Sequence, residues 1–100
     1  MRVAVIDDEE VIRDVLVEMF LERNFEAIAY VDGTEILSDI NPENQPDFII
    51  IDLGLPKMSG LDCYNELIKM GISSKVIFSS GKAPSKEIKE LVKKNKASFI

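Results

Sequence analysis

The chain has 100 residues, of which 46% are hydrophobic and 30% charged, and its formal net charge is −6 at pH 7. Such a composition is ordinary for one small globular domain with a core of its own. A single cysteine, Cys63, and no histidine exclude an internal disulfide and argue against zinc or redox-pair chemistry. No apolar run reaches the ~18 residues of a membrane span, and the acidic start MRVAVIDDEE does not fit a signal peptide.

Charge divides the chain into two halves of opposite sign. Residues 1–50 hold 13 acids and 3 bases, a balance of −10, whereas residues 51–100 hold 5 acids and 9 bases, a balance of +4. The acidic half argues against general nucleic-acid binding. Six lysines lie between Lys82 and Lys96, and we interpret them as a solvated helix face that is open to a charged partner.

Predicted strands and helices alternate through the first half. RVAVI, residues 2–6, is short, apolar and β-branched, which predicts a buried strand. Helical spacing then predicts a helix with Asp8 as N-cap and an apolar stripe of Val11, Ile12, Val15, Leu16, Met19 and Phe20. EAIAY, residues 26–30, predicts a second strand, and Thr34 can cap a short helix whose inward residues are Ile36, Leu37 and Ile40.

The second half continues this alternation. DFIII, residues 47–51, is apolar on both faces, as is typical of a strand in the middle of a covered parallel sheet. A helix is predicted at residues 61–70, ended by Gly71, and a strand follows at 75–79. A further helix is predicted at 85–95 and a last strand at 97–100. The whole order predicts an α/β fold, a doubly wound parallel sheet with right-handed crossovers.

Polar side chains gather where the predicted inner strands end. They are Asp7 and Asp8 after the first strand, Asp52 after the third, and Ser79, Ser80 and Gly81 at the end of the fourth. In sheets of this kind, ligands bind at the carboxyl ends of the strands. The chain has no glycine-rich phosphate loop, so a nucleotide site has little support.

The three carboxylates at this edge would repel one another, and without a cation at least one should have a raised pKa. A hard divalent cation such as Mg2+ relieves the repulsion and prefers oxygen ligands. Mg2+ beside a carboxylate also suits phosphoryl transfer in which the carboxylate is the nucleophile. Ser80 could then donate a hydrogen bond to a phosphoryl oxygen.

Three stretches carry a family resemblance: VAVIDDEEVIR, DFIIIDLGLPKMSGLD and KVIFSSG. In order and spacing they resemble the receiver domain of two-component response regulators, including the Asp-x-x-x-Pro-x-x-x-Gly loop of Asp52, Pro56 and Gly60. The resemblance implies a flavodoxin-like fold with strand order 2-1-3-4-5. It also implies that residues 1–100 form a single receiver domain.

The resemblance assigns chemistry to the acidic residues. It implies that Asp52 accepts a phosphoryl group from the phosphohistidine of a histidine kinase. Asp7 and Asp8 would help Asp52 to hold Mg2+, with the backbone carbonyl of Gly54 as a further ligand. The domain would not turn over a metabolite, so an enzyme in the ordinary sense is not expected.

The resemblance also implies a switch. Ser80 would be the hydroxyl residue that moves toward the phosphoryl group, and Phe99 would be the aromatic switch residue. Gly81 stands where the family has a small residue, which leaves access to the site. The face of the fourth helix and fifth strand would then bind a downstream effector or output domain, with no membrane and no direct nucleic-acid contact. A cytoplasmic location is expected.

Two departures from the family concern the C-terminal part. The family's strand-five lysine would fall two positions past Ile100, and the family's fifth helix has no counterpart, so we expect a C-terminally incomplete receiver domain. Lys96 and Ala97 also replace the usual Gly-Ala pair. Without the fifth helix, one sheet face beside the first helix should be uncovered, which predicts marginal stability or self-association through that face.

Two other functions are compatible with the acidic cluster. The first is a receiver-like interaction module that is not phosphorylated in this form. The second is a Mg2+-dependent phosphohydrolase with an aspartate nucleophile. Such enzymes usually carry another aspartate two residues after the nucleophile, and here that position is Gly54.

Overall fold

The computed structural model describes residues 1–81 and 83–100, so Lys82, the first of the six C-terminal lysines, lies outside the described residues. Strands and helices alternate in the order β1 (Arg2–Ile6), α1 (Glu10–Glu22), β2 (Glu26–Tyr30), α2 (Gly33–Asp39), β3 (Phe48–Asp52), α3 (Gly60–Lys69), β4 (Lys75–Ser79), α4 (Lys86–Lys93) and β5 (Ser98–Phe99). None of the helices within these residues is long and apolar enough to cross a membrane.

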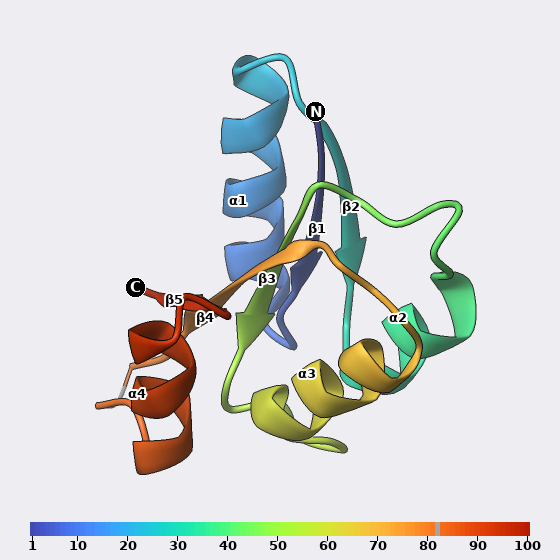
Figure 1. The fold of residues 1–100 in the computed structure, drawn as a ribbon. Coiled ribbons are helices and arrows are strands. Elements are labelled where there is room, and N and C mark those ends of the chain that lie inside the picture. Colours follow the sequence, from blue (N-terminus) through green and yellow to red (C-terminus); the bar gives the residue numbers. More distant parts are fainter. Residues whose placement is uncertain (82) are drawn as a thin grey trace.

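The five strands form one parallel sheet in the order β2-β1-β3-β4-β5 (Figure 1). This is the flavodoxin-like order predicted from the sequence, and no fifth helix is present among the described residues. In the sheet register, Ile6 at the end of β1 lies beside Ile51, and Asp52 at the end of β3 lies beside Ser79. The ends of these three strands therefore meet at one edge of the sheet.

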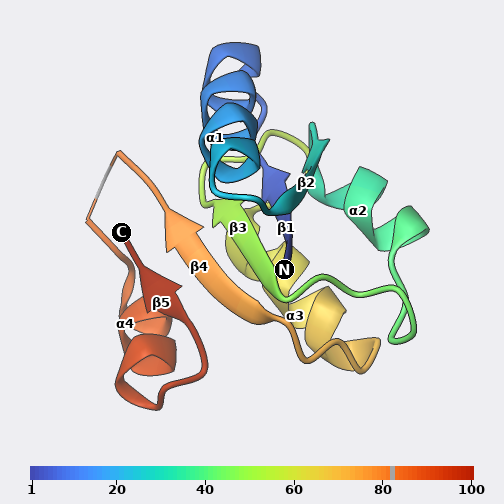
Figure 2. The same cartoon turned by 90° about the horizontal axis from the view of Figure 1, so that it is seen from above.

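The two faces of the sheet are covered differently (Figure 2). Helix α1 lies on one face, whereas α2, α3 and α4 lie on the other. The three-helix face holds one continuous core in which strand residues such as Ile49 and Phe78 are fully buried with Ile36, Leu67 and Ile88 from the helices. We call this side the covered face, and it supplies most of the buried apolar surface that stabilises the domain.

The opposite side, which we call the α1 face, is only partly closed. Val3, Val5 and Ile50 of the central strands are buried, but no residue of α1 is fully buried. Within the predicted stripe of α1, Leu16 and Phe20 are half-buried and four residues are exposed: Val11, Ile12, Val15 and Met19. The exposed apolar side chains here belong to α1 itself, whereas Val3, Val5 and Ile50 of the sheet are buried, so the expected uncovered sheet face stays a prediction.

Helix starts differ from the prediction at two caps. Asp8 is not the N-cap of α1; Glu9 takes that place and makes no side-chain capping hydrogen bond. Thr34 does not cap α2 either, because Asp32 accepts the Glu35 N–H at 3.0 Å while the Thr34 hydroxyl donates to Asp32. Nearby polar residues can serve as alternative caps, and the local backbone decides where the helix begins.

Other boundaries shift by one or two residues. The third strand includes Asp52 and omits Asp47, and the third helix begins at Gly60 rather than at residue 61. The fourth helix is Lys86–Lys93, capped by Ser85, rather than 85–95, and the fifth strand is Ser98–Phe99 rather than 97–100. Gly71 ends the third helix with φ +80°, a conformation that suits glycine, as predicted.

Candidate functional site

Three carboxylates converge at the carboxyl edge of the sheet. Asp7 and Asp8 directly follow β1, and Asp52 is the last residue of β3, the neighbouring strand. One carboxylate oxygen from each residue lies within 4.8 Å of the other two. The parallel pairing of β1 and β3 is what brings these acids together, because it aligns the ends of the two strands.

The three carboxylates differ in burial. Asp7 is buried, Asp52 is half-buried and Asp8 is exposed. Burial raises the pKa of Asp7, a hydrogen bond from the Glu9 N–H at 2.9 Å opposes the rise, and the negative charges of Asp52 and Asp8 add to it. The expectation that at least one acid of the cluster has a raised pKa is therefore confirmed, with desolvation as the larger cause.

The nearby arginine of α1 does not neutralise the cluster. Nη1 of Arg13 donates to the backbone carbonyl oxygen of Asp7 at 2.8 Å, so it ties the first turn of the helix to the end of β1. Across residues 1–81 and 83–100, no lysine or arginine forms an ion pair with any of the three carboxylates. Helical periodicity alone does not predict this contact, because it depends on the direction of the Arg13 side chain.

The donor set suits a hard divalent cation. All the converging side-chain atoms are carboxylate oxygens, which Mg2+ prefers over nitrogen or sulfur. The cluster combines negative charge with partial burial and has no protein cation paired with it among the described residues. Desolvation is the main cause of the raised pKa of Asp7, and a bound divalent cation would relieve the carboxylate repulsion that adds to it.

The loop after β3 is shaped around Asp52. The Gly54 N–H donates to Oδ1 of Asp52 at 3.1 Å, which orients the carboxylate. A Cβ atom on Gly60 would lie 2.7 Å from the carbonyl oxygen of Asp52 and 2.9 Å from Cα of Leu53, closer than real contacts allow. Only glycine lets α3 begin this close to the end of β3, which explains the residue physically. Pro56 is exposed midway along the loop.

The same loop is tied to the start of α2. Nζ of Lys57 lies 3.6 Å from Oδ2 of Asp32, the N-cap of that helix. The Thr34 hydroxyl and the Glu35 N–H donate to the same carboxylate and lower its pKa, with Lys57 adding to the shift. This link was not predicted, because no local sequence pattern pairs residue 32 with residue 57.

A pocket opens beside Asp52 toward the loop after β4. Its lining includes Gly54, Leu61, Ser80, Gly81 and Ile88 together with Asp52. Ser80 thus borders the same space as Asp52, as the strand order predicts. A Cβ on Gly81 would meet no atom within 4 Å, so this rim of the pocket is open.

Phe99 lies on β5, away from this pocket lining. It pairs with Phe78 of β4, is half-buried and packs against the covered-face core. It also lines a second pocket with Pro84, Lys89 and Lys93 on the surface of α4. The structure therefore joins Phe99 to the lysine-rich face of α4 and not directly to the three carboxylates.

Comparison with known proteins identifies relatives of the same architecture. The transcription regulator BvgA of Bordetella pertussis is 27% identical over 99 residues, which cover 99% of this chain and 47% of BvgA. The chain therefore spans about half the length of this curated relative. The structure of the Francisella response regulator 1452 receiver domain matches with a TM-score of 0.82 and 29% identity, covering 99% of this chain and 81% of that chain.

Another solved relative is a complex that contains Mg2+. It is the response regulator TrrA of Thermotoga maritima in complex with Mg2+-BeF, which matches with a TM-score of 0.73 and 28% identity over 94% of this chain and 97% of that chain. Residues 3–100 also match the family described as the response regulator receiver domain. Because that match extends over nearly the whole chain, the chain belongs to the response regulator receiver domain family.

Proposed function

We propose that this chain is a phosphoacceptor receiver domain in which Asp52 takes a phosphoryl group from the phosphohistidine of a histidine kinase. The observation that carries the proposal is the cluster of Asp7, Asp8 and Asp52, whose oxygens lie within 4.8 Å of one another at the end of two central strands. Membership of the receiver family and the pocket that exposes Asp52 beside Ser80 support it.

The reaction needs only one nucleophile from this chain. A carboxylate oxygen of Asp52 forms a bond to phosphorus while the bond from phosphorus to the histidine nitrogen breaks, and the nitrogen keeps the electron pair. The Gly54 N–H holds the Asp52 carboxylate through Oδ1 during this approach. The open rim at Gly81 gives the donor access to the pocket.

Asp7, Asp8 and Asp52, with the Gly54 carbonyl, are the groups that would hold Mg2+. Bound there, Mg2+ supplies positive charge beside the phosphoryl oxygens. The all-oxygen donor set supports this assignment, and so does the relative described with Mg2+-BeF. Asp7 keeps its position because it is buried and hydrogen-bonded to Glu9.

Phosphorylation would change the surface formed by α4 and β5, in the C-terminal part of the chain. Ser80 borders the acceptor pocket, and Phe99 joins the core to the α4 surface with its exposed lysines. We infer that Ser80 moves toward the phosphoryl group and that Phe99 and α4 follow as one two-state unit. The changed face of α4 and β5 would bind an acidic region of a downstream effector or output domain in the cytoplasm.

Exposed apolar side chains on the α1 face suggest a further contact. Val11, Ile12, Val15 and Met19 form an exposed apolar row along one helix. We infer that two copies associate weakly through this row when nothing else covers it.

The test is the intact mass of the chain after incubation with acetyl phosphate, with and without Mg2+. We expect the gain of one phosphoryl group only with Mg2+, and no gain for Asp52→Asn. Asp14→Asn, an exposed acid on α1, is the matched control and should be phosphorylated like the unmodified chain. No gain in the unmodified chain would reject phosphotransfer and favour an interaction module that is not phosphorylated.

A further inference from the structure

Strand β2 forms one open edge of the sheet. Within the described residues it pairs only with β1. The Glu26 N–H and the Tyr30 carbonyl, at the two ends of β2, both bond toward the β1 side. Backbone groups of a parallel strand alternate in direction, so those of Ala27 and Ala29 point away from the sheet. Two N–H groups and two carbonyls are therefore directed outward along this edge.

This edge has little of the usual protection against strand addition. Only Glu26, at the start of EAIAY, is charged, the strand contains no lysine and no proline, and Ile28 is 45% exposed. Natural sheets normally guard such an edge with charge, proline or a covering segment. Beyond Tyr30 the next outward N–H, that of Val31, is not available to an added strand, because it donates to Oε1 of Glu35 at 3.1 Å. The free stretch is thus short and limited to the two alanines.

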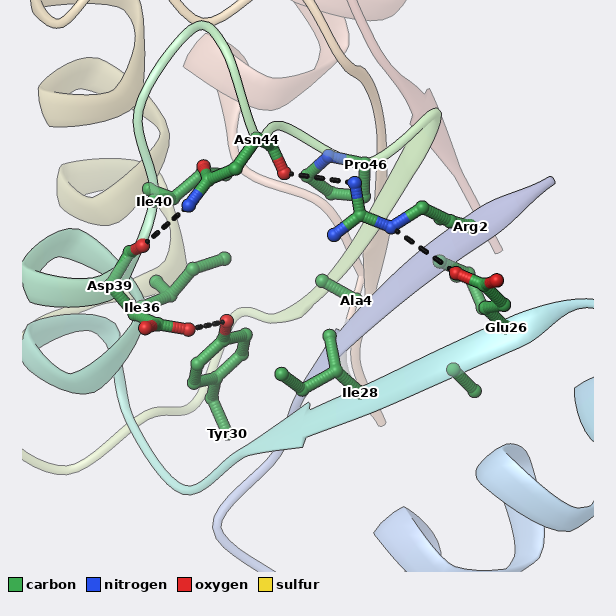
Figure 3. A pocket seen from close by; sticks show the side chains of 12 residues that line it. Arg2, Ala4, Glu26, Ile28, Tyr30, Ile36, Asp39, Ile40, Asn44 and Pro46 are labelled. Atoms are coloured by element: carbon green, nitrogen blue, oxygen red, sulfur yellow. Dashed lines mark hydrogen bonds and ion pairs between the residues drawn. The ribbon is translucent and has the colours of Figure 1, made fainter.

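A pocket lies beside the same edge, between β1, β2, α2 and the loop that follows α2 (Figure 3). Its apolar lining includes Ala4, Ile28, Ile36, Ile40 and Pro46. Its polar lining is made of Arg2, Glu26, Tyr30, Asp39 and Asn44. Figure 3 shows these side chains surrounding a hollow, with Tyr30 and Asp39 at one end and Arg2 and Glu26 at the other.

Most polar groups around the hollow already have partners. The Tyr30 hydroxyl donates to Oδ2 of Asp39, and Nη1 of Arg2 donates to the Asn44 carbonyl at 3.1 Å. Nε of Arg2 lies 3.6 Å from Oε2 of Glu26. Within residues 1–81 and 83–100, the Asp39 carboxylate accepts a side-chain hydrogen bond from Tyr30 alone. The pocket lining holds two acids and one base, a balance of −1, and Asp39 is exposed, so its carboxylate is open to a cation.

The charge around this pocket extends over a larger surface. Residues 22–47 hold seven acids and one base, a balance of −6, which equals the net charge of the whole chain. A segment that approaches β2 therefore meets a negative field. The field favours a basic partner and disfavours an acidic one.

We propose that the β2 edge and the adjacent pocket bind an extended basic segment of a partner protein. The segment adds a strand beside β2 by pairing with the backbones of Ala27 and Ala29. Alternate side chains of an added strand point to the same face, so one lysine or arginine reaches into the pocket toward Asp39. This surface is separate from the three carboxylates, and its binding does not depend on phosphorylation of Asp52.

The test uses the full, isotopically labelled chain and the probe peptide acetyl-Thr-Lys-Val-Lys-Thr-amide, followed by amide chemical shifts. We expect saturable shifts at Ala27, Ala29 and Asp39, and binding about tenfold or more weaker for the matched peptide with glutamate in place of lysine. Shifts centred on α4 or α1, or equal binding of both peptides, would overturn the proposal.

Two N-methylated versions of the lysine peptide separate strand pairing from plain charge attraction. One is methylated on the odd residues and the other on the even residues. Strand addition predicts that one version loses binding by about tenfold or more while the other keeps it, because only one set of N–H groups faces β2. Equal binding of both versions would overturn the strand-addition geometry.

Variants of the chain test the same site from the other side. Ala29→Pro removes an outward N–H without removing a bond to β1, and should abolish peptide binding. Asp39→Asn should weaken binding of the lysine peptide, whereas Asp14→Asn, on α1, should leave it unchanged. Circular dichroism checks the fold of each variant, and the N-methylated peptides decide the outcome if Ala29→Pro does not fold. Unchanged binding by folded Ala29→Pro would reject the proposal.

Discussion

The two faces of the sheet are covered by helices to different extents. On the covered face, Ile49 and Phe78 are fully buried beneath three helices. On the α1 face, Ile77, which is adjacent to Phe78 in the same strand, remains partly exposed. A strand supplies both faces with equal numbers of side chains, so the difference comes from what packs against it.

Helix capping follows the same division. The three helices on the covered face begin with side-chain caps, from Asp32, Ser59 and Ser85. The N-cap of α1, Glu9, makes no side-chain capping hydrogen bond. The loop after Asp52 is fixed against α2 and α3, two of the helices on the covered face. The Asp52 side of the acid site therefore depends on the covered face, whereas the Asp7 side is tied to the first turn of α1 through Arg13.

Matched isoleucine truncations should produce the largest contrast between the faces. Ile49→Ala removes a fully buried side chain and should lower the free energy of unfolding by about 2–5 kcal/mol. Ile77→Ala, on the α1 face, should cost only about 1 kcal/mol because that side chain is already partly exposed. Urea denaturation of both variants measures the difference, and equal losses would contradict the account of the two faces.

Matched glycine substitutions test the same contrast around the site. Gly60→Ala forces a methyl group against the end of β3 and should lower the free energy of unfolding by about 1–3 kcal/mol. It should also slow phosphorylation, because Asp52 would shift. Gly81→Ala meets open space and should leave stability nearly unchanged. A tolerated Gly60→Ala with normal phosphorylation would show that the loop is not fixed by this close approach.

Lysine substitutions on α1 test whether the α1 face is an association surface. Val15→Lys with Met19→Lys should change stability by less than about 0.5 kcal/mol, since both side chains are already exposed. The same pair should abolish any increase of mass with concentration in sedimentation equilibrium. Ile68→Lys, an equally exposed site on α3, is the control and should leave association unchanged. An unmodified chain that stays monomeric at every concentration would disprove self-association.

A small pH effect should report the cap on the covered face. Hydrogen bonds from Thr34 and Glu35 hold the pKa of Asp32 below its ordinary value of 3.8, so its charged form stabilises the fold. This contribution is present above that value and is lost as the pH falls below it. Asp32→Asn should therefore be less stable than the unmodified chain at about pH 6, with a narrower gap at about pH 3. Thermal denaturation at both pH values measures the stability difference between Asp32→Asn and the unmodified chain. A difference that does not change with pH would contradict the stabilising role of the charged Asp32 cap.

The fold was predictable because its strands are short apolar runs separated by amphipathic helices. EAIAY and KVIFS were predicted with the bounds that the structure has. The cap at Thr34 was wrong because Asp32, two residues earlier, accepts the Glu35 N–H. The cap at Asp8 was wrong because Glu9 takes the N-cap position and makes no side-chain capping hydrogen bond. The sequence also could not show how deeply each residue of α1 is buried, since that depends on neighbours from distant segments.

The candidate site was partly predictable for a similar reason. Convergence of Asp7, Asp8 and Asp52 follows from strand order, which the alternation of elements determines. The Lys57–Asp32 pair and the contact from Arg13 to Asp7 were missed, because both depend on side-chain directions across tertiary contacts. Nor could the sequence tell adjacent acids apart: Asp7 is buried and Asp8 is exposed.

The most direct test of the central claim is to locate the phosphoryl group on the chain. After treatment with acetyl phosphate and Mg2+, borohydride reduction converts an aspartyl phosphate to homoserine, and peptide mass spectrometry finds its position. The account predicts homoserine at position 52 alone, with Asp7 and Asp8 unchanged. Homoserine at another acid, or at none, would contradict the assignment of Asp52 as the phosphoacceptor.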